Sequence, residues 1–326
     1  MSEKTKAGPS GFTNFADIEK LSPKEKIDIY DRMMTDAQVR QAINDKRFAV
    51  ISSDWEVLAA SPGARDTEIA AFVKRSLDQM RGSVVQAAFG IMNALVHGYS
   101  ISEMVFKPVE TGADAGRWRI EALKPKHPRD YDFDIDPLGN ITAIWITDGN
   151  GHRSKLPLWK FIIHTSRPEF GRPCGRSDLH AVYKHWWSKD FLLKWWNIYL
   201  ETYGAPTRFG KYPAGDTAES KQEDLKRVLR DIVNNTAIAI HDDMDVDLVT
   251  SAGAAGFEAA IEYHDHQIVM GIVGGGEGYV VSLRRNIEDV VSGDIIKRMV
   301  DFNFASVDDY PRFRFKPKKS TASYRA

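Results

Sequence analysis

The feature that most constrains this chain is an aromatic helix near residue 190. Trp187, Phe191, Trp195 and Tyr199 recur at every fourth position, and Trp196 lies beside them on the helical surface. This spacing predicts a wide apolar stripe along a helix of about seven turns. A buried helix within a large enzyme is the plainer interpretation. One small domain rarely supplies enough partner surface for such a stripe, whereas neighbouring subunits can.

The segment after this helix reads as a small unit of strands. Gly204 can adopt the left-handed conformation that ends a helix, and Pro206 forbids further helix. Residues 205–252 then predict a strand, an amphipathic helix and two more strands. A unit this small is close to the lower size limit for independent stability. The strand that contains Phe209 and Tyr212 is therefore predicted to pair with a neighbouring subunit.

The first half of the chain predicts an α+β unit over residues 25–174. Helices are expected from the capping box at Ser22, from Asp66, and over 84–96, where an apolar run ends at Gly98. Short runs of β-branched and aromatic residues between turn signals predict strands. These predicted strands are 101–109, 118–123, 131–135, 141–147 and 161–165.

The C-terminal third predicts two long helices around a glycine-rich loop. The helices are expected over 254–273 and from about residue 283 to 304. Between them stand Gly274, Gly275, Gly276, Glu277, Gly278 and Tyr279. Because two helices end there and glycine adds conformational freedom, residues 274–282 are predicted to be the least ordered part outside the termini.

Composition excludes several classes of protein. Lys and Arg number 44 and Asp and Glu 45 among 326 residues, a net charge of −1 that disfavours tight, sequence-specific DNA binding. Cys174 is the only cysteine, so an internal disulfide and a cysteine-based metal cluster are excluded. No run approaches about 18 apolar residues, so no transmembrane helix is expected. The first residues lack a signal sequence and read as a flexible arm.

The sequence contains no strong motif for catalysis, nucleotide binding or metal binding. The glycine loop lacks the Gly-Lys-Ser/Thr ending of a P-loop. His264 and His266 are two residues apart, which turns them away from each other on a helix, and the other histidines lack metal-ligand spacing. No nucleophile elbow appears. An acidic turn at Asp242, Asp243 and Asp245 could collect a divalent cation, although such turns are usually solvated. No catalytic residue, metal site or cofactor is expected.

Several short runs carry a family resemblance. Two follow the aromatic helix: Glu-Thr-Tyr-Gly-Ala-Pro at 201–206 and Gly-Lys-Tyr-Pro at 210–213. The others lie at 32–39, 97–105, 160–164 and 171–177. The ordered set resembles the Mu-like phage portal proteins over most of residues 25–315. Members of that family are usually longer, so a helical C-terminal crown is expected to be reduced or absent.

The resemblance implies an α+β portal-type fold, assembled as a ring. Its implied parts are an N-terminal arm (1–24), a wing (25–174), a stem helix (175–204), a clip (205–252), a second stem helix (253–273), a tunnel loop (274–283), a tunnel helix (284–305) and a C-terminal strand and tail (306–326).

The function implied is that of a ring, usually of twelve subunits, at one vertex of the capsid. It would admit the genome, dock the large terminase subunit, and join the head to the tail adaptor. The resemblance also implies contact with the major capsid protein and scaffold, non-specific contact with double-stranded DNA, assembly in the bacterial cytoplasm and a place in the virion. Another phage ring component, such as an adaptor or baseplate protein, and a metal-dependent nucleic-acid enzyme stay open as alternatives.

The residue patterns and the resemblance together give candidate residues for three roles. The candidates for the DNA channel are Gly274, Gly275, Gly276, Glu277, Gly278, Tyr279, Arg284 and Arg285. The candidates for the subunit interface are Trp187, Phe191, Trp195, Trp196, Tyr199, Phe209 and Tyr212. Asp242, Asp243 and Asp245 are the candidates for contact with terminase or adaptor.

Overall fold

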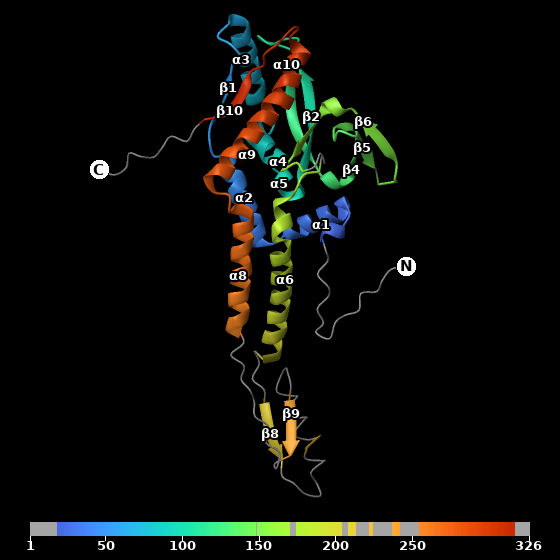
Figure 1. The fold of residues 1–326 in the computed structure, drawn as a ribbon, viewed down its shortest axis with the longest axis vertical. Helices are drawn as coiled ribbons and strands as arrows, with labels where there is room; N and C mark the ends of the chain where they lie inside the picture. Colours follow the sequence, from blue (N-terminus) through green and yellow to red (C-terminus); the bar gives the residue numbers. More distant parts are fainter. Residues whose placement is uncertain are drawn as a thin grey trace, which may run out of the picture. The chain divides into compact units, whose positions relative to one another are not determined.

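The computed structural model describes residues 18–147, 149–169, 174–203, 208–212, 222–223, 237–241 and 254–316 (Figure 1). The chain divides into two compact units. The larger unit comprises Met1–Tyr183 and Ile268–Ala326, and the smaller unit comprises Lys184–Gln267. Among the described residues no helix is both long and apolar enough to cross a membrane.

Some helices of the larger unit begin or end at a capping residue. Its helices before residue 170 are η1 (Ile18–Lys20), α1 (Pro23–Met33), α2 (Ala37–Ile51), α3 (Ala64–Asp78), α4 (Ser83–Ile91), α5 (Ala94–His97), η2 (Pro128–Asp130) and η3 (Leu158–Lys160). The predicted capping box starts α1: the Ser22 hydroxyl accepts from the Glu25 N–H, and the Glu25 carboxylate accepts from the Ser22 N–H. Gly98, at φ +85°, closes α5 in the left-handed conformation.

Three small antiparallel sheets complete the described part of the larger unit. One has the order β3 (Trp118–Lys126), β2 (Tyr99–Pro108), β7 (Phe161–Thr165), and another has the order β4 (Tyr131–Ile135), β5 (Ile141–Thr147), β6 (Arg153–Leu156). The third pairs β1 (Trp55–Leu58) with β10 (Arg312–Phe315). The five predicted strands are present, whereas β1 and β6 were not predicted.

A buried cluster holds the first two sheets and α1 together. It contains Ile27 of α1, Tyr99 and Ile101 of β2, Tyr131 of β4, Ile144 of β5 and Phe161 of β7. The third sheet is held by aromatic contacts, since the ring of Trp55 stacks on that of Phe313 at 5.5 Å between centroids. The C-terminal strand therefore folds back onto the N-terminal half of the chain.

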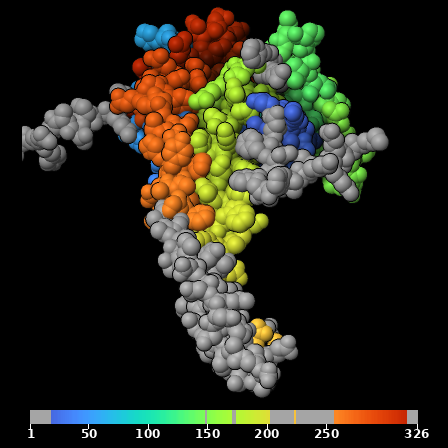
Figure 2. Space-filling model, turned by 60° about the horizontal axis from the view of Figure 1, so that its bottom comes forward, coloured from blue at the N-terminus to red at the C-terminus, as the bar shows by residue number. Residues whose placement is uncertain are grey.

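The smaller unit contains parts of the two longest helices. They are α6 (Asp178–Tyr203), which is the predicted aromatic helix, and α8 (Ala254–Val273). Within this unit the two helices lie side by side (Figures 1 and 2). The ammonium of Lys189 lies 2.6 Å from the carboxylate of Asp265, and the rings of Tyr199 and Phe257 are 5.8 Å apart.

The described part of residues 205–252 is a parallel pair of strands. β8 (Arg208–Tyr212) pairs with β9 (Ala237–His241), with Phe209 opposite Ile238. One edge of β8 is therefore satisfied within the same chain, and pairing with a neighbouring subunit stays a prediction for its other edge. The helix expected near residue 229 and the strand expected over 246–249 lie outside the described residues.

The glycine-rich segment corrects one prediction. Helix α9 (Gly276–Val290) begins inside the expected loop, so only Gly274 and Gly275 separate it from α8. Leu283 is buried and the Tyr279 side chain packs against its own chain. These contacts outweigh the helix penalty of a glycine, which is about 1 kcal/mol. The helix then continues through a π-helical turn (Val291–Ile296) into α10 (Lys297–Asn303).

Candidate functional site

The aromatic stripe of α6 is present, and part of it is exposed. Trp187 stacks on Phe191 at 5.7 Å between ring centroids, and Phe191 meets the edge of Trp195 at 5.9 Å. Trp187, Phe191, Trp196 and Tyr199 are half-buried. Four apolar side chains of α6 in the smaller unit are more exposed: Leu193 (38%), Trp195 (43%), Ile198 (40%) and Leu200 (47%).

These exposed side chains lie on two flanks of the helix. Leu193 and Leu200 are seven residues apart and share one flank. At 100° per residue, Trp195 points about 150° away from the middle of that pair. The smaller unit therefore presents apolar surface in two widely separated directions from one helix.

The candidate channel residues divide into two groups. Gly274, Gly275, Gly276, Glu277, Gly278 and Arg285 are exposed. Tyr279 and Arg284 instead contact their own chain, and the guanidinium of Arg284 donates to the carbonyl oxygen of Ala49 at 2.7 Å. These contacts engage two of the three side chains that were expected to reach passing DNA, and leave Arg285 exposed.

Tyr279 is part of a buried ionic cluster. The ammonium of Lys46 lies 2.7 Å from Oδ2 of Asp178, and these side chains are 3% and 0% exposed. The same ammonium lies 4.0 Å from the centre of the Tyr279 ring. The Tyr279 hydroxyl donates to Oδ2 of Asp178 at 3.4 Å, and Arg167 approaches Oδ1 at 3.3 Å. The cluster joins α2, the start of α6 and the start of α9.

Burial shifts the pKa values of this cluster. Burial lowers the pKa of Lys46, while the charge of Asp178 acts in the opposite direction. Burial, helped by the charge of Asp178, raises the pKa of Tyr279 to about 12. The tyrosine is therefore neutral at physiological pH, and its hydroxyl donates a hydrogen bond to the carboxylate of Asp178. These groups hold α2, the start of α6 and the start of α9 together, and Arg167 and Tyr279 also line a cavity of about 320 Å³.

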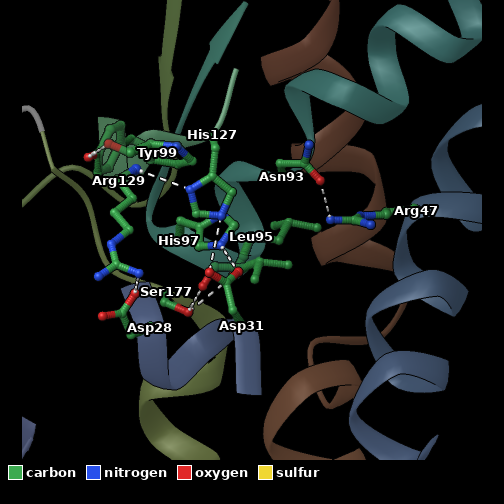
Figure 3. A network of polar contacts seen from close by, with 12 residues as sticks. Asp28, Asp31, Arg47, Asn93, Leu95, His97, Tyr99, His127, Arg129 and Ser177 are labelled. Atoms are coloured by element: carbon green, nitrogen blue, oxygen red, sulfur yellow. Dashed lines mark hydrogen bonds and ion pairs between the residues drawn. The ribbon is translucent and has the colours of Figure 1, made fainter. Parts of the chain in front are cut away.

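A second polar network brings together residues that are distant in sequence (Figure 3). Asp31 lies on α1, His97 is the last residue of α5, and His127 precedes η2. Nε2 of His97 is 2.8 Å from Oδ1 of Asp31, and Nε2 of His127 is 3.1 Å from Oδ2. Each of the three residues offers a possible metal-binding atom, and these atoms lie within 4.8 Å of one another.

Neighbouring contacts fix the network in place. The Ser177 hydroxyl donates to the carbonyl oxygens of Leu95 and Val96, just before His97. Arg129 pairs with Asp28 at 2.7 Å. Sequence analysis missed this network because Asp31 is 66 residues from His97 and 96 from His127. Histidine spacing within a single element, which is the usual signal of a metal site, is absent here.

The remaining predicted site residues are less fully described. Asp242, Asp243 and Asp245 lie outside the described residues. Phe209 and Tyr212 stand in β8, where the backbone pairing is defined. Tyr263-His264-Asp265-His266 lies within α8, and Nδ1 of His264 is 3.1 Å from Nδ1 of His185 on α6.

Comparison with known proteins identifies the family. The family model described as the portal protein of Mu bacteriophage matches residues 27–278. The Mu-like prophage FluMu protein gp29 of Haemophilus influenzae is 22% identical over 242 residues, which are 74% of this chain and 45% of the relative. The portal protein of Escherichia phage Mu is 24% identical over 254 residues, 76% of this chain and 47% of the relative.

A solved structure shares the fold. A chain from the neck of a native gene transfer agent particle, computed with C12 symmetry, aligns with a TM-score of 0.59 at 11% identity. The alignment covers 91% of this chain and 85% of that chain. The present chain spans about half the length of the curated relatives that it matches. Since the family model covers most of the sequence, this chain belongs to the family of Mu bacteriophage portal proteins.

Proposed function

We propose that this protein forms a portal ring at one vertex of a phage capsid. The ring is the channel through which the genome is packaged and later ejected, and it is the platform for the head-tail connection. Membership of the Mu portal family and the shared fold with a particle-neck chain support this role. A portal acts mechanically, so the protein itself is proposed to catalyse no reaction.

The observation that carries the proposal is the pair of exposed apolar flanks on α6. A closed ring of identical subunits needs two different faces on each subunit, one for each neighbour. Trp195 on one flank and Leu193 and Leu200 on the other supply such a pair. Burying one large apolar side chain contributes roughly 1.5–3 kcal/mol, and each ring repeats the contact at every interface. The C12 symmetry of the gene transfer agent neck favours twelve subunits.

The proposed channel lining follows from the exposed residues at the start of α9. Gly274–Gly278 and Arg285 are exposed and would repeat around the ring. Repeated cationic side chains contact phosphates without reading bases. Because the chain has a net charge of −1, the contact with double-stranded DNA is weak and non-specific, which suits a molecule that must slide.

The proposed partners are those of a portal vertex. The segment that contains Asp242, Asp243 and Asp245 contacts the large terminase subunit and the head-tail adaptor. The larger unit contacts the major capsid protein and scaffold. Assembly takes place in the host cytoplasm, and the protein remains in the virion.

Ring formation tests the proposal. The purified full chain is expected to form particles with a central hole in negative-stain electron microscopy. Trp195→Glu should give a soluble chain that forms no rings, because the charge cannot be buried at the subunit contact. Leu138→Glu is the control, since Leu138 is 84% exposed on a turn of the larger unit and should tolerate the charge. Intact rings from Trp195→Glu would exclude the α6 flank as the contact, and a monomeric wild-type chain would contradict the proposal.

A further inference from the structure

The network of Asp31, His97 and His127 has the composition of a metal site. Two imidazole nitrogens and a carboxylate oxygen converge from three separate elements, with both Nε2 atoms directed at one carboxylate (Figure 3). Two histidines with one carboxylate are a ligand set used for zinc and for ferrous iron. Calcium and magnesium prefer oxygen ligands alone, which this set does not provide.

We propose that Asp31, His97 and His127 bind a divalent transition-metal ion of the zinc class. The ligands are Nε2 of both imidazoles and one carboxylate oxygen of Asp31. Water completes the coordination, because only three protein ligands converge among the described residues. The bound ion fastens α1 to the end of α5 and to the turn that leads into β4.

Burial of the three ligands differs in a way that suits a site at the surface. The His97 side chain is 9% exposed, while those of Asp31 and His127 are 40% and 44% exposed. His97 is thus the fixed inner ligand, and the other two form the entrance. An ion can reach this entrance from solvent without opening the fold.

The carboxylate is in the state that a metal requires. Burial raises the pKa of Asp31, but the hydrogen bonds and charges of His97 and His127 outweigh it, and the pKa lies below its usual value. The group is therefore ionised at neutral pH, so no proton must leave it when the ion binds.

The proton positions on the two imidazoles disfavour binding of a metal ion at Nε2. The backbone N–H of Arg129 donates to Nδ1 of His127 at 3.3 Å, which places the ring proton on Nε2. Binding at Nε2 would move that proton to Nδ1 and break this exposed contact, which water can replace. Nδ1 of His97 is buried without a hydrogen-bond partner. A proton there would be a buried donor without an acceptor, which weakens metal binding.

That cost reduces the gain from the ion. Metal binding at structural zinc sites with four ligands supplies a large part of the free energy of folding. A three-ligand site gains less from the ion, and the unsatisfied N–H of His97 lowers that gain further. A missing outer partner for a ligating histidine weakens metal affinity by about 10- to 100-fold. The site is therefore expected to bind more weakly than a structural zinc site, and to exchange its ion.

Cobalt provides a direct probe of the site. The full chain, without a histidine tag and after treatment with a chelator, is titrated with Co²⁺ and then with Zn²⁺. We expect one Co²⁺ per chain, with visible d–d absorption that Zn²⁺ abolishes. His127→Gln and Asp31→Asn should each weaken binding by at least about 10-fold. Both residues are partly exposed, so these variants test the site even if His97→Gln fails to fold.

The matched control is His264→Gln. His185 and His264 approach each other through their Nδ1 atoms at 3.1 Å and could bind Co²⁺ as a pair. Retention of the cobalt spectrum in His264→Gln, together with its loss in His127→Gln, supports the proposal. Loss in His264→Gln with retention in His127→Gln overturns it, and so does a wild-type chain that binds no Co²⁺. None of these results depends on ring formation, so the proposed portal function is tested separately.

Discussion

At the scale of single residues, burial of His164 makes stability depend on pH. Burial lowers the pKa of this histidine on β7 to about 4. The unfolded chain has a histidine pKa near 6.5, so between these two values only the unfolded state takes up the proton. The titration of His164 therefore leaves the free energy of unfolding almost unchanged above about pH 6.5. It lowers that free energy as the pH falls from there towards 4.

This difference predicts that the chain loses stability between pH 7 and pH 5. His164 alone should lower the free energy of unfolding by about 2 kcal/mol over this interval. Urea unfolding at the two pH values measures the loss. In His164→Gln the loss should be smaller by that amount. An equal loss in both proteins would show that the imidazole becomes protonated in the folded state.

The Lys46–Asp178 pair illustrates a different consequence of burial at the same scale. Lys46→Met leaves the fully buried carboxylate of Asp178 with the partly exposed Arg167 as its ionic partner. Breaking a buried pair from one side costs about 3–5 kcal/mol. Urea unfolding should show that loss in the single variant. Lys46→Met combined with Asp178→Asn should recover much of it, because no uncompensated charge remains. A double variant no more stable than the single one would show that the charge is not the cause.

At the scale of elements, local patterns predicted some parts of the fold and missed others for physical reasons. Strands β4, β5 and β7 were predicted with their observed bounds, because short apolar runs are separated there by clear turn signals. Strand β6 is a polar edge strand, Arg-Ser-Lys-Leu, and among the described strands it pairs with β5 alone. Strand β1 has four residues, and its partner β10 lies more than 250 positions later. Neither carries a local signal strong enough to distinguish it from a loop.

Helix α2 was missed because its buried face contains charged residues. Lys46 and Arg47 are 4% and 5% exposed, although lysine and arginine in a sequence usually indicate a solvent-exposed position. Lys46 is buried by the pair with Asp178, and Arg47 by a hydrogen bond to Asn93 and by the Phe89 ring. The Asp31 network and the helical state of residues 276–283 depend on tertiary partners in the same way. The aromatic stripe of α6 could be predicted because all of its residues lie in one helix and recur with the helical period.

The glycines around the start of α9 give a prediction at the scale of this element. A Cβ added at Gly275 would lie 2.5 Å from Cβ of Tyr279, whereas one added at Gly278 would meet nothing within 4 Å. Gly275→Ala must therefore displace Tyr279 and should destabilise the chain by about 1–3 kcal/mol. Gly278→Ala stands within the helix and should stabilise it by about 0.5–1 kcal/mol. Thermal unfolding of both variants checks the opposite signs. Equal effects would show that this segment is a loop after all.

At the scale of the whole molecule, the proposed ring would bring together unlike faces of α6 from neighbouring subunits. In such a ring the Trp195 flank of one subunit meets the Leu193 and Leu200 flank of the next. This arrangement differs from a two-fold contact, in which one face would meet its own copy. The difference can be tested with two variants that each carry a charge on one flank, Trp195→Glu and Leu200→Glu.

Each variant alone is expected to remain monomeric. Every contact between two of its copies would include one flank that carries the introduced glutamate, which is what is meant by a damaged face. Mixed together, they should form one-to-one heterodimers, since the intact Trp195 flank of the Leu200→Glu chain can meet the intact Leu200 flank of the Trp195→Glu chain. The mixture cannot grow further, because the two outer faces of the heterodimer are both damaged. Native mass spectrometry of the separate and mixed variants distinguishes these species. Homodimers of Leu200→Glu alone would instead show that the Trp195 flank pairs with itself, and complete rings from either variant would show that α6 does not form the contact.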